Sequence, residues 1–103
     1  MDEPTKSLPQ PLRFEWDPGK AAANLKKHGI SFEEAATVFD DPYAAFQTDE
    51  RYTDTELREW IIGYSNRSRM LLVVFVEREQ NLIRIITARK PTSQERIIYE
   101  EAP

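Results

Sequence analysis

Residues 14–42 read FEWDPGKAAANLKKHGISFEEAATVFDDP, and this stretch indicates two consecutive helices. Asp17 followed by Pro18 is typical of a helix start, because the aspartate oxygen can accept from the first turn and proline has no N–H to leave unpaired there. Gly29 predicts the end of this helix, since glycine adopts the left-handed C-terminal conformation without a steric penalty. The first helix is therefore expected over residues 18–28.

A second helix is expected to follow at once. Ser31 stands three residues before Glu34, which is the spacing of a capping box. Four apolar residues repeat at helical spacing and predict a core-facing stripe: Phe32, Ala35, Ala36 and Phe39. Asp41-Pro42 then ends the helix.

Strand patterns surround this block. Residues 12–16 alternate apolar and charged side chains, as a short strand does. Further strands are expected at residues 43–48, 59–64, 70–76 and 82–88, with polar turns at 65–69 and 77–81. The run MLLVVFV at 70–76 is apolar at every position, which indicates a central strand covered on both faces.

The last helix is expected to begin at Thr92 or Ser93, with Thr92 and Glu95 at capping-box spacing. Ile97 and Ile98 would dock this helix on the sheet. The sequence predicts one α+β domain over residues 13–103: an N-terminal strand, two helices, an antiparallel sheet of three to four strands and a C-terminal helix. Residues 1–12 are proline-rich, do not resemble a secretory signal, and are expected to form a disordered lead segment.

Composition narrows the function classes. The chain has 103 residues, no cysteine and one histidine, which excludes disulfides and argues against a structural zinc site or another metal cofactor. No apolar run approaches the roughly 20 residues of a membrane helix, so no membrane contact is expected. The lack of cysteine allows a cytoplasmic location, which is the expectation here.

The charge is unevenly distributed. The net charge is −4, yet residues 65–91 carry six cations against two acids, and residues 49–59 carry five acids against two bases. Five of these six cations are arginines, whose planar guanidinium suits phosphate. The pattern leaves two interpretations open: a localised anion site, or solvated strand and turn positions.

The ordered motifs resemble a known family. The 14–42 block is similar to the start of the BrnT toxins, small bacterial proteins that are paired with an antitoxin. IIGYS at 61–65, IRIITAR at 83–89 and ERIIYE at 95–100 match the same family in the same order. The resemblance covers roughly residues 13–101 and implies a RelE-like fold and a ribonuclease toxin.

This resemblance raises the question of which residues cleave RNA. Metal-independent cleavage can use the 2′-hydroxyl of the substrate as nucleophile, and it needs a base, cations for the phosphate, and an acid. The candidate catalytic residues are Arg67, Arg69, Arg89, Glu95 and Tyr52. The candidate RNA-binding residues are Arg78, Arg84, Lys90, Lys27 and His28.

Several candidates also have structural interpretations. Arg67 and Arg69 could simply keep a turn soluble, and Arg89 could pair with Glu95 or with an acid of residues 49–59. Strand alternation puts Arg84 and Arg89 on opposite faces unless a bulge intervenes.

The last helix and the histidine carry alternatives of the same kind. Glu95 is favoured as the capping-box residue over a base, and Tyr99 as a packing residue. His28 is expected chiefly at the C-terminus of the first helix, where the dipole favours positive charge.

One departure from the family bears on activity. Family members commonly carry a histidine where this chain has Tyr52. A tyrosine hydroxyl can donate a proton but is a poor base at neutral pH. The alternative function is therefore a weak or inactive toxin-like module that binds the antitoxin or RNA.

The resemblance also implies partners. These are a cognate ribbon-helix-helix antitoxin whose acidic segment would cover the arginine surface, an RNA substrate, and operator DNA reached only through the antitoxin. The resemblance also allows a dimer of this chain within the toxin–antitoxin complex.

Overall fold

The computed structural model describes residues 11–48 and 57–101. The predicted lead segment lies almost wholly outside the described residues. Tyr52 lies outside them as well.

The two N-terminal helices begin and end where their capping residues predict. In α1 (Pro18–His28) the Asp17 side chain accepts from the backbone N–H of Lys20 at 2.9 Å. Gly29 has φ 71° and its N–H donates to the Leu25 carbonyl at 2.8 Å. The second helix, α2 (Phe32–Thr37), continues as a short 3-10 helix, η2 (Val38–Asp40).

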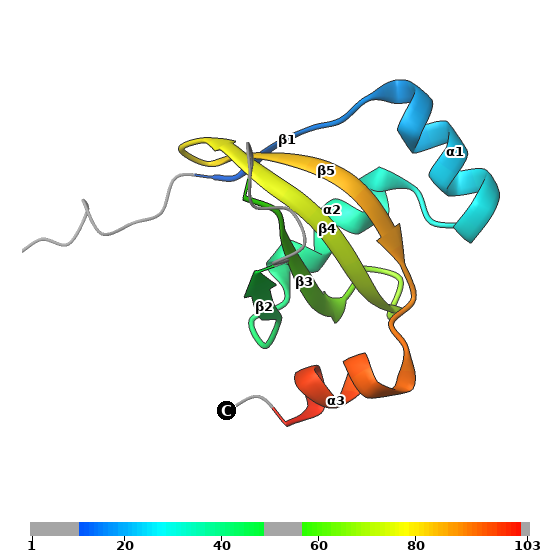
Figure 1. Ribbon diagram of the computed structural model, residues 1–103, viewed down its shortest axis with the longest axis vertical. Coiled ribbons are helices and arrows are strands. Elements are labelled where there is room, and N and C mark those ends of the chain that lie inside the picture. Colours follow the sequence, from blue (N-terminus) through cyan, green and yellow to red (C-terminus); the bar gives the residue numbers. More distant parts are fainter. Residues whose placement is uncertain (1–10, 49–56, 102–103) are drawn as a thin grey trace, which may run out of the picture.

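Five strands form one sheet in the order β1-β5-β4-β3-β2 (Figure 1). The strands are β1 (Arg13–Glu15), β2 (Ala45–Thr48), β3 (Glu59–Tyr64), β4 (Met70–Glu79) and β5 (Leu82–Arg89). β2 to β5 pair antiparallel, as predicted. β1 adds a fifth strand, which runs parallel to β5 with Phe14 opposite Ile83. The sheet therefore has one strand more than the upper limit of three to four that the sequence predicted for it, because the predicted N-terminal strand joins the same sheet.

The hairpin between β4 and β5 is tighter than predicted. Residues 77–79 continue β4, so the predicted turn at 77–81 shrinks to Gln80 and Asn81. Asn81 has φ 66°, a conformation that asparagine tolerates better than most residues. The strand register shifts between Glu77 and Glu79, so Arg78 is an extra residue of β4 beside this turn.

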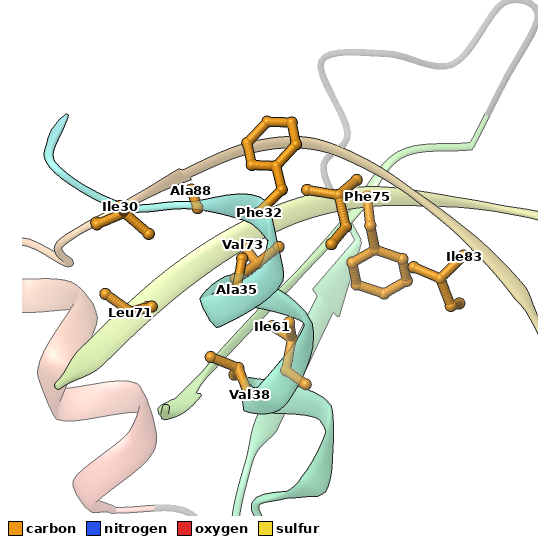
Figure 2. Close-up of a cluster of buried hydrophobic side chains, with 11 residues drawn as sticks. Ile30, Phe32, Ala35, Val38, Ile61, Leu71, Val73, Phe75, Ile83 and Ala88 are labelled. Carbon is orange, nitrogen blue, oxygen red and sulfur yellow. The ribbon is translucent and has the colours of Figure 1, made fainter. Parts of the chain in front are cut away.

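The main core lies between α2 and one face of the sheet (Figure 2). Phe32, Ala35 and Val38 are fully buried against Ile61, Val73 and other residues of that face. On the opposite face Ile62, Met70 and Leu72 form a smaller cluster under α3 (Ser93–Glu100).

The residues of α3 that reach this second cluster are Ile98 and Tyr99. Ile97 was predicted to dock as well, but it is 47% exposed. It follows Arg96 on the outer side of a short helix in which no residue is fully buried.

A bulge in β5 settles the orientation of its arginines. Val74 lies opposite Thr87 and Phe75 lies opposite Ile85, so Ile86 is an extra residue in β5. Arg84 then pairs with Val76 and Arg89 pairs with Leu72. Because residues four apart in β4 share a face, Arg84 and Arg89 lie on the same face.

Candidate phosphate-binding site at one end of the sheet

The turn between β3 and β4, the end of β5 and the start of α3 meet at one end of the sheet (Figure 1). This end brings together five residues that the sequence singled out: Arg67, Arg69, Arg89, Lys90 and Glu95. The two hairpin segments are adjacent because Tyr64 pairs with Met70 and Leu72 pairs with Arg89.

Glu34 fixes the turn that carries Arg69. Its side chain is only 4% exposed, and its carboxylate accepts from Arg69 Nε at 3.0 Å and from Arg69 Nη2. Ser65 Oγ donates to the same carboxylate at 2.6 Å. Hydrogen bonds from Arg69 hold the pKa of Glu34 below its usual value despite burial.

The capping box predicted at Ser31 and Glu34 is therefore half right. Ser31 Oγ accepts from the Glu34 N–H at 3.0 Å, as a cap does. The Glu34 side chain instead reaches across to the turn at Ser65 and Arg69.

Arg67 lies in the same turn but is held more loosely. Its side chain is 68% exposed, and Nη1 lies 3.9 Å from Glu34 Oε1. The next residue, Ser68, has φ 61°, a left-handed conformation that favours glycine. The Arg67 guanidinium is thus accessible to a ligand at the rim of this end.

Arg89 forms a paired contact with Glu95. Nη1 donates to Oε1 at 2.8 Å and Nη2 donates to Oε2 at 3.0 Å. The Glu95 carboxylate also accepts from the Thr92 N–H, which completes the predicted capping box. Hydrogen bonds from Arg89 lower the pKa of Glu95 to about 2. A carboxylate with so low a pKa is a weak base at neutral pH.

A hollow of about 280 Å³ opens beside these pairs. It is lined by Arg69, Met70, Lys90, Pro91 and Arg96. Lys90 forms no ion pair with the described residues. The Arg96 side chain is 46% exposed, and its ion-pair partner is the exposed Glu100 at 3.5 Å. Three cations around one concave surface form a site that can bind a phosphate.

Two other candidates belong to α1. Lys27 and His28 form its last turn, and Arg69 Nη2 donates to the Gly29 carbonyl at 3.2 Å. The end of α1 is thereby joined to the Ser65–Arg69 turn.

The structure does not bring Arg78 and Arg84 to this end. Arg84 Nη1 pairs with Glu15 at 3.2 Å, beside β1. Arg78 lines a separate hollow of about 690 Å³ that also contains Glu59, Glu77 and Glu79. Their binding of RNA stays a prediction, and they lie away from the basic end of the sheet.

A second polar group secures α3. The Tyr99 hydroxyl donates to Asp41 Oδ2 at 2.8 Å, and the Tyr64 N–H donates to the same oxygen at 2.8 Å. Burial opposes ionisation of Asp41, but hydrogen bonds from Tyr64, Tyr43 and Tyr99 outweigh it and lower its pKa. Burial and the bond to Asp41 raise the pKa of Tyr99 to about 12. Tyr99 both packs, as predicted, and anchors the helix.

Sequence reasoning missed Arg96, Asp41 and Asn24, and assigned Glu34 only as a cap. Arg96 belongs to the ERIIYE motif and follows the capping residue Glu95, which was a usable signal. The Asn24 side chain, which is buried, bonds to Ala88 N and O and to Ile30 O at 2.9–3.1 Å. Nothing in the local sequence indicates that an asparagine in mid-helix faces inward.

Residues 11–48 and 57–101 contain neither a metal site nor a membrane-spanning helix. No group of three or more His, Cys, Asp or Glu side chains there could hold a metal ion. No helix there is long and apolar enough to cross a membrane.

Comparisons with known proteins agree with this architecture. The 1.1 Å crystal structure of the Brucella abortus ribonuclease toxin BrnT matches with a TM-score of 0.58 and 20% identity. The match covers 80% of this chain and 99% of that one, and at this identity it shows a shared α+β fold. No curated protein matches the chain. The profile of the family described as "Ribonuclease toxin, BrnT, of type II toxin-antitoxin system" matches residues 16–95, so the chain belongs to the BrnT family of ribonuclease toxins.

Proposed function

We propose that this chain is a cytoplasmic, metal-independent endoribonuclease whose active site is the basic end of the sheet. The observation that carries the proposal is the convergence of Arg69, Lys90 and Arg96 on one hollow. In this mechanism the 2′-hydroxyl of the RNA gives its proton to water and attacks the adjacent phosphate, and the departing 5′-oxygen takes a proton from water. The cations stabilise the charge that develops on the phosphate oxygens, and the 5′-oxygen leaves.

The carboxylates near the site act by positioning. Glu34 orients Arg69, and Glu95 orients Arg89 through two parallel hydrogen bonds. Bidentate pairs of this kind fix the direction of a guanidinium as well as its place. The low pKa of Glu95 favours this role over the base role considered from the sequence.

The chemistry can be tested with purified protein and a defined RNA in the presence of EDTA. The proposal expects cleavage that leaves a 2′,3′-cyclic phosphate and a 5′-hydroxyl. It also expects that a single 2′-deoxy substitution at the cleaved position stops the reaction. Cleavage that requires an added divalent metal, or products with 5′-phosphates, would overturn the mechanism.

We further propose that the cognate antitoxin is a ribbon-helix-helix protein that covers the same end with an acidic segment. Membership of a toxin–antitoxin family supports a partner, and complementary charge supports the surface. Operator DNA would then be bound by the antitoxin, within a complex that can contain two toxin copies. Sedimentation of the co-expressed toxin and antitoxin gives the stoichiometry of the complex. If the double variant Lys90→Glu with Arg96→Glu binds the antitoxin as tightly as wild type, the antitoxin does not cover this end of the sheet.

A second candidate function is a toxin-like module that binds RNA or antitoxin without cleaving. It is favoured by Tyr52, which stands where family members commonly have a histidine. RNA binding without any cleavage product in the EDTA experiment would support this module.

A further inference from the structure

A second hollow, of about 270 Å³, lies between α1 and β5. It is lined by Lys20, Ala23, Asn24, Lys27, His28, Ile86 and Thr87. This is smaller than the roughly 300–1,000 Å³ of a pocket that encloses a drug-sized molecule. The hollow therefore suits one small planar group, such as a single nucleobase.

The charged rim of this hollow is positive. Its charged or titratable lining residues are Lys20, Lys27 and His28, and no carboxylate contributes. Neither lysine forms an ion pair within the described part of the chain. In contrast, Arg69, Arg84 and Arg89 each have a carboxylate partner. Unpaired lysines can meet a phosphate without first breaking an internal bond.

The floor of the hollow is suited to contact with a nucleobase. Ala23 and Ile86 supply apolar surface, and Thr87 supplies an exposed hydroxyl that can donate or accept. Asn24 is committed to Ile30 and Ala88, so it shapes the hollow without offering a free amide. Single-stranded RNA is recognised where an unstacked base meets such a surface while cations hold its backbone.

Residues that line the hollow are neighbours in sequence of residues at the proposed active site. His28 at its rim precedes Gly29, whose carbonyl accepts from Arg69 at 3.2 Å. Thr87 in its lining is followed by Ala88 and then Arg89, which pairs with Glu95. A strand of RNA with one phosphate near Arg69 could therefore continue along β5 toward α1.

We propose that the hollow between α1 and β5 binds a nucleotide of single-stranded RNA that flanks the cleaved bond. This inference rests on the proposed function, since it assumes that the RNA reaches the basic end of the sheet. Lys20 and Lys27 would contact phosphate, and Ala23, Ile86 and Thr87 would contact the base.

The test uses an eight-nucleotide RNA with every 2′-hydroxyl methylated, so that binding is measured without cleavage. Lys27→Ala is compared with Lys26→Ala, which removes the same charge from the neighbouring position outside the hollow. Fluorescence anisotropy at several salt concentrations gives the affinity and its salt slope. Amide signals of Ile86 and Thr87 in labelled wild-type protein report whether RNA enters the hollow.

We expect Lys27→Ala to weaken binding about tenfold and to reduce the salt slope by about 0.7, as for one lost phosphate contact. Lys26→Ala should stay within about twofold of wild type, because a charge outside the path acts only through the screened field. RNA should also shift the Ile86 and Thr87 signals.

Equal effects of the two substitutions, or unshifted amide signals, would overturn the inference. RNA cleavage by the wild type would then still support the proposed function. Conversely, Lys27→Ala could weaken RNA binding selectively while the wild type leaves unmodified RNA uncleaved. That result would support RNA binding in the hollow and count against the ribonuclease activity.

Discussion

At the scale of single residues, two carboxylates determine how this site is built. Glu34 is buried under the β3–β4 turn and accepts hydrogen bonds from Arg69, and Glu95 lies at the start of α3 and accepts them from Arg89. The sequence offers a pair between Arg89 and Glu95 as an alternative to a functional arginine, because the two residues are close in the chain. It cannot predict Glu34–Arg69, which joins residues 35 positions apart.

Replacing Arg69 by Ala should destabilise the fold as well as the site. It would leave the Glu34 carboxylate buried without its main partner, at a cost of about 3 kcal/mol in the free energy of unfolding. The double variant Glu34→Gln with Arg69→Met should recover most of this loss. Urea unfolding measures both, and a harmless Arg69→Ala would contradict the pairing.

Glu95 should make the fold sensitive to acid. Its pKa falls from 4.5 to about 2 in the folded protein, so its stabilisation is present above pH 4.5 and is lost as the pH falls toward 2. The contribution is on the order of 2 kcal/mol after allowance for solvent screening. In Glu95→Gln, stability at pH 7 should drop by this amount and decline less steeply below pH 4.5. Parallel pH–stability curves for the two proteins would disprove the assignment.

At the scale of elements, local signals predict where helices begin and end, and burial decides which way they face. Asp17, Gly29 and Thr92 act as the sequence indicates. The inward face of α1 is different, since Leu25 is 52% exposed while Asn24 is buried against β5. Asn24 forms hydrogen bonds with the backbone N–H and C=O of Ala88, at a part of β5 that β1 does not pair with. This role depends on a strand that is distant in the sequence.

Asn24→Ala should detach α1 from the sheet. The change leaves the N–H and C=O of Ala88 and the C=O of Ile30 without this partner. Unpaired buried groups of this kind should cost about 3 kcal/mol together. Thermal unfolding gives the loss, with Lys26→Ala on the exposed side of the helix as the control.

Tyr99→Phe should loosen α3 while leaving the rest of the sheet intact. It removes the hydroxyl that donates to Asp41 but keeps the ring on Tyr64. The expected cost is about 1 kcal/mol, since the bond is only partly shielded from water. Faster hydrogen exchange should be confined to residues 93–100, and uniform exchange across the protein would contradict a local anchor.

At the scale of the whole molecule, the order of predicted elements gives the α+β class but not the full strand pairing of the sheet. The parallel pairing of β1 with β5 and the bulge at Ile86 both depend on contacts that no local pattern encodes. The bulge matters for the site because it turns Arg89 to the face that α3 covers. Arg67, Arg69, Arg89 and Lys90, which the sequence singles out, lie together at the basic end of the sheet, whereas Arg78 and Arg84 lie elsewhere. The concave form of this end and the part of Arg96 in it were not predicted.

The most direct measurement of the central claim is the RNA cleavage rate of Arg96→Ala beside Arg13→Ala. Arg96 lines the hollow and has only an exposed partner, so its removal should leave the fold intact. Arg13 is also exposed and pairs with Glu79 at 3.9 Å, but it lies on β1, away from the hollow. We predict a loss of about 100-fold for Arg96→Ala, as for one donor to a developing charge, and a wild-type rate for Arg13→Ala. A wild-type rate for both variants, with unchanged unfolding temperatures, would contradict the claim that this end of the sheet is the active site.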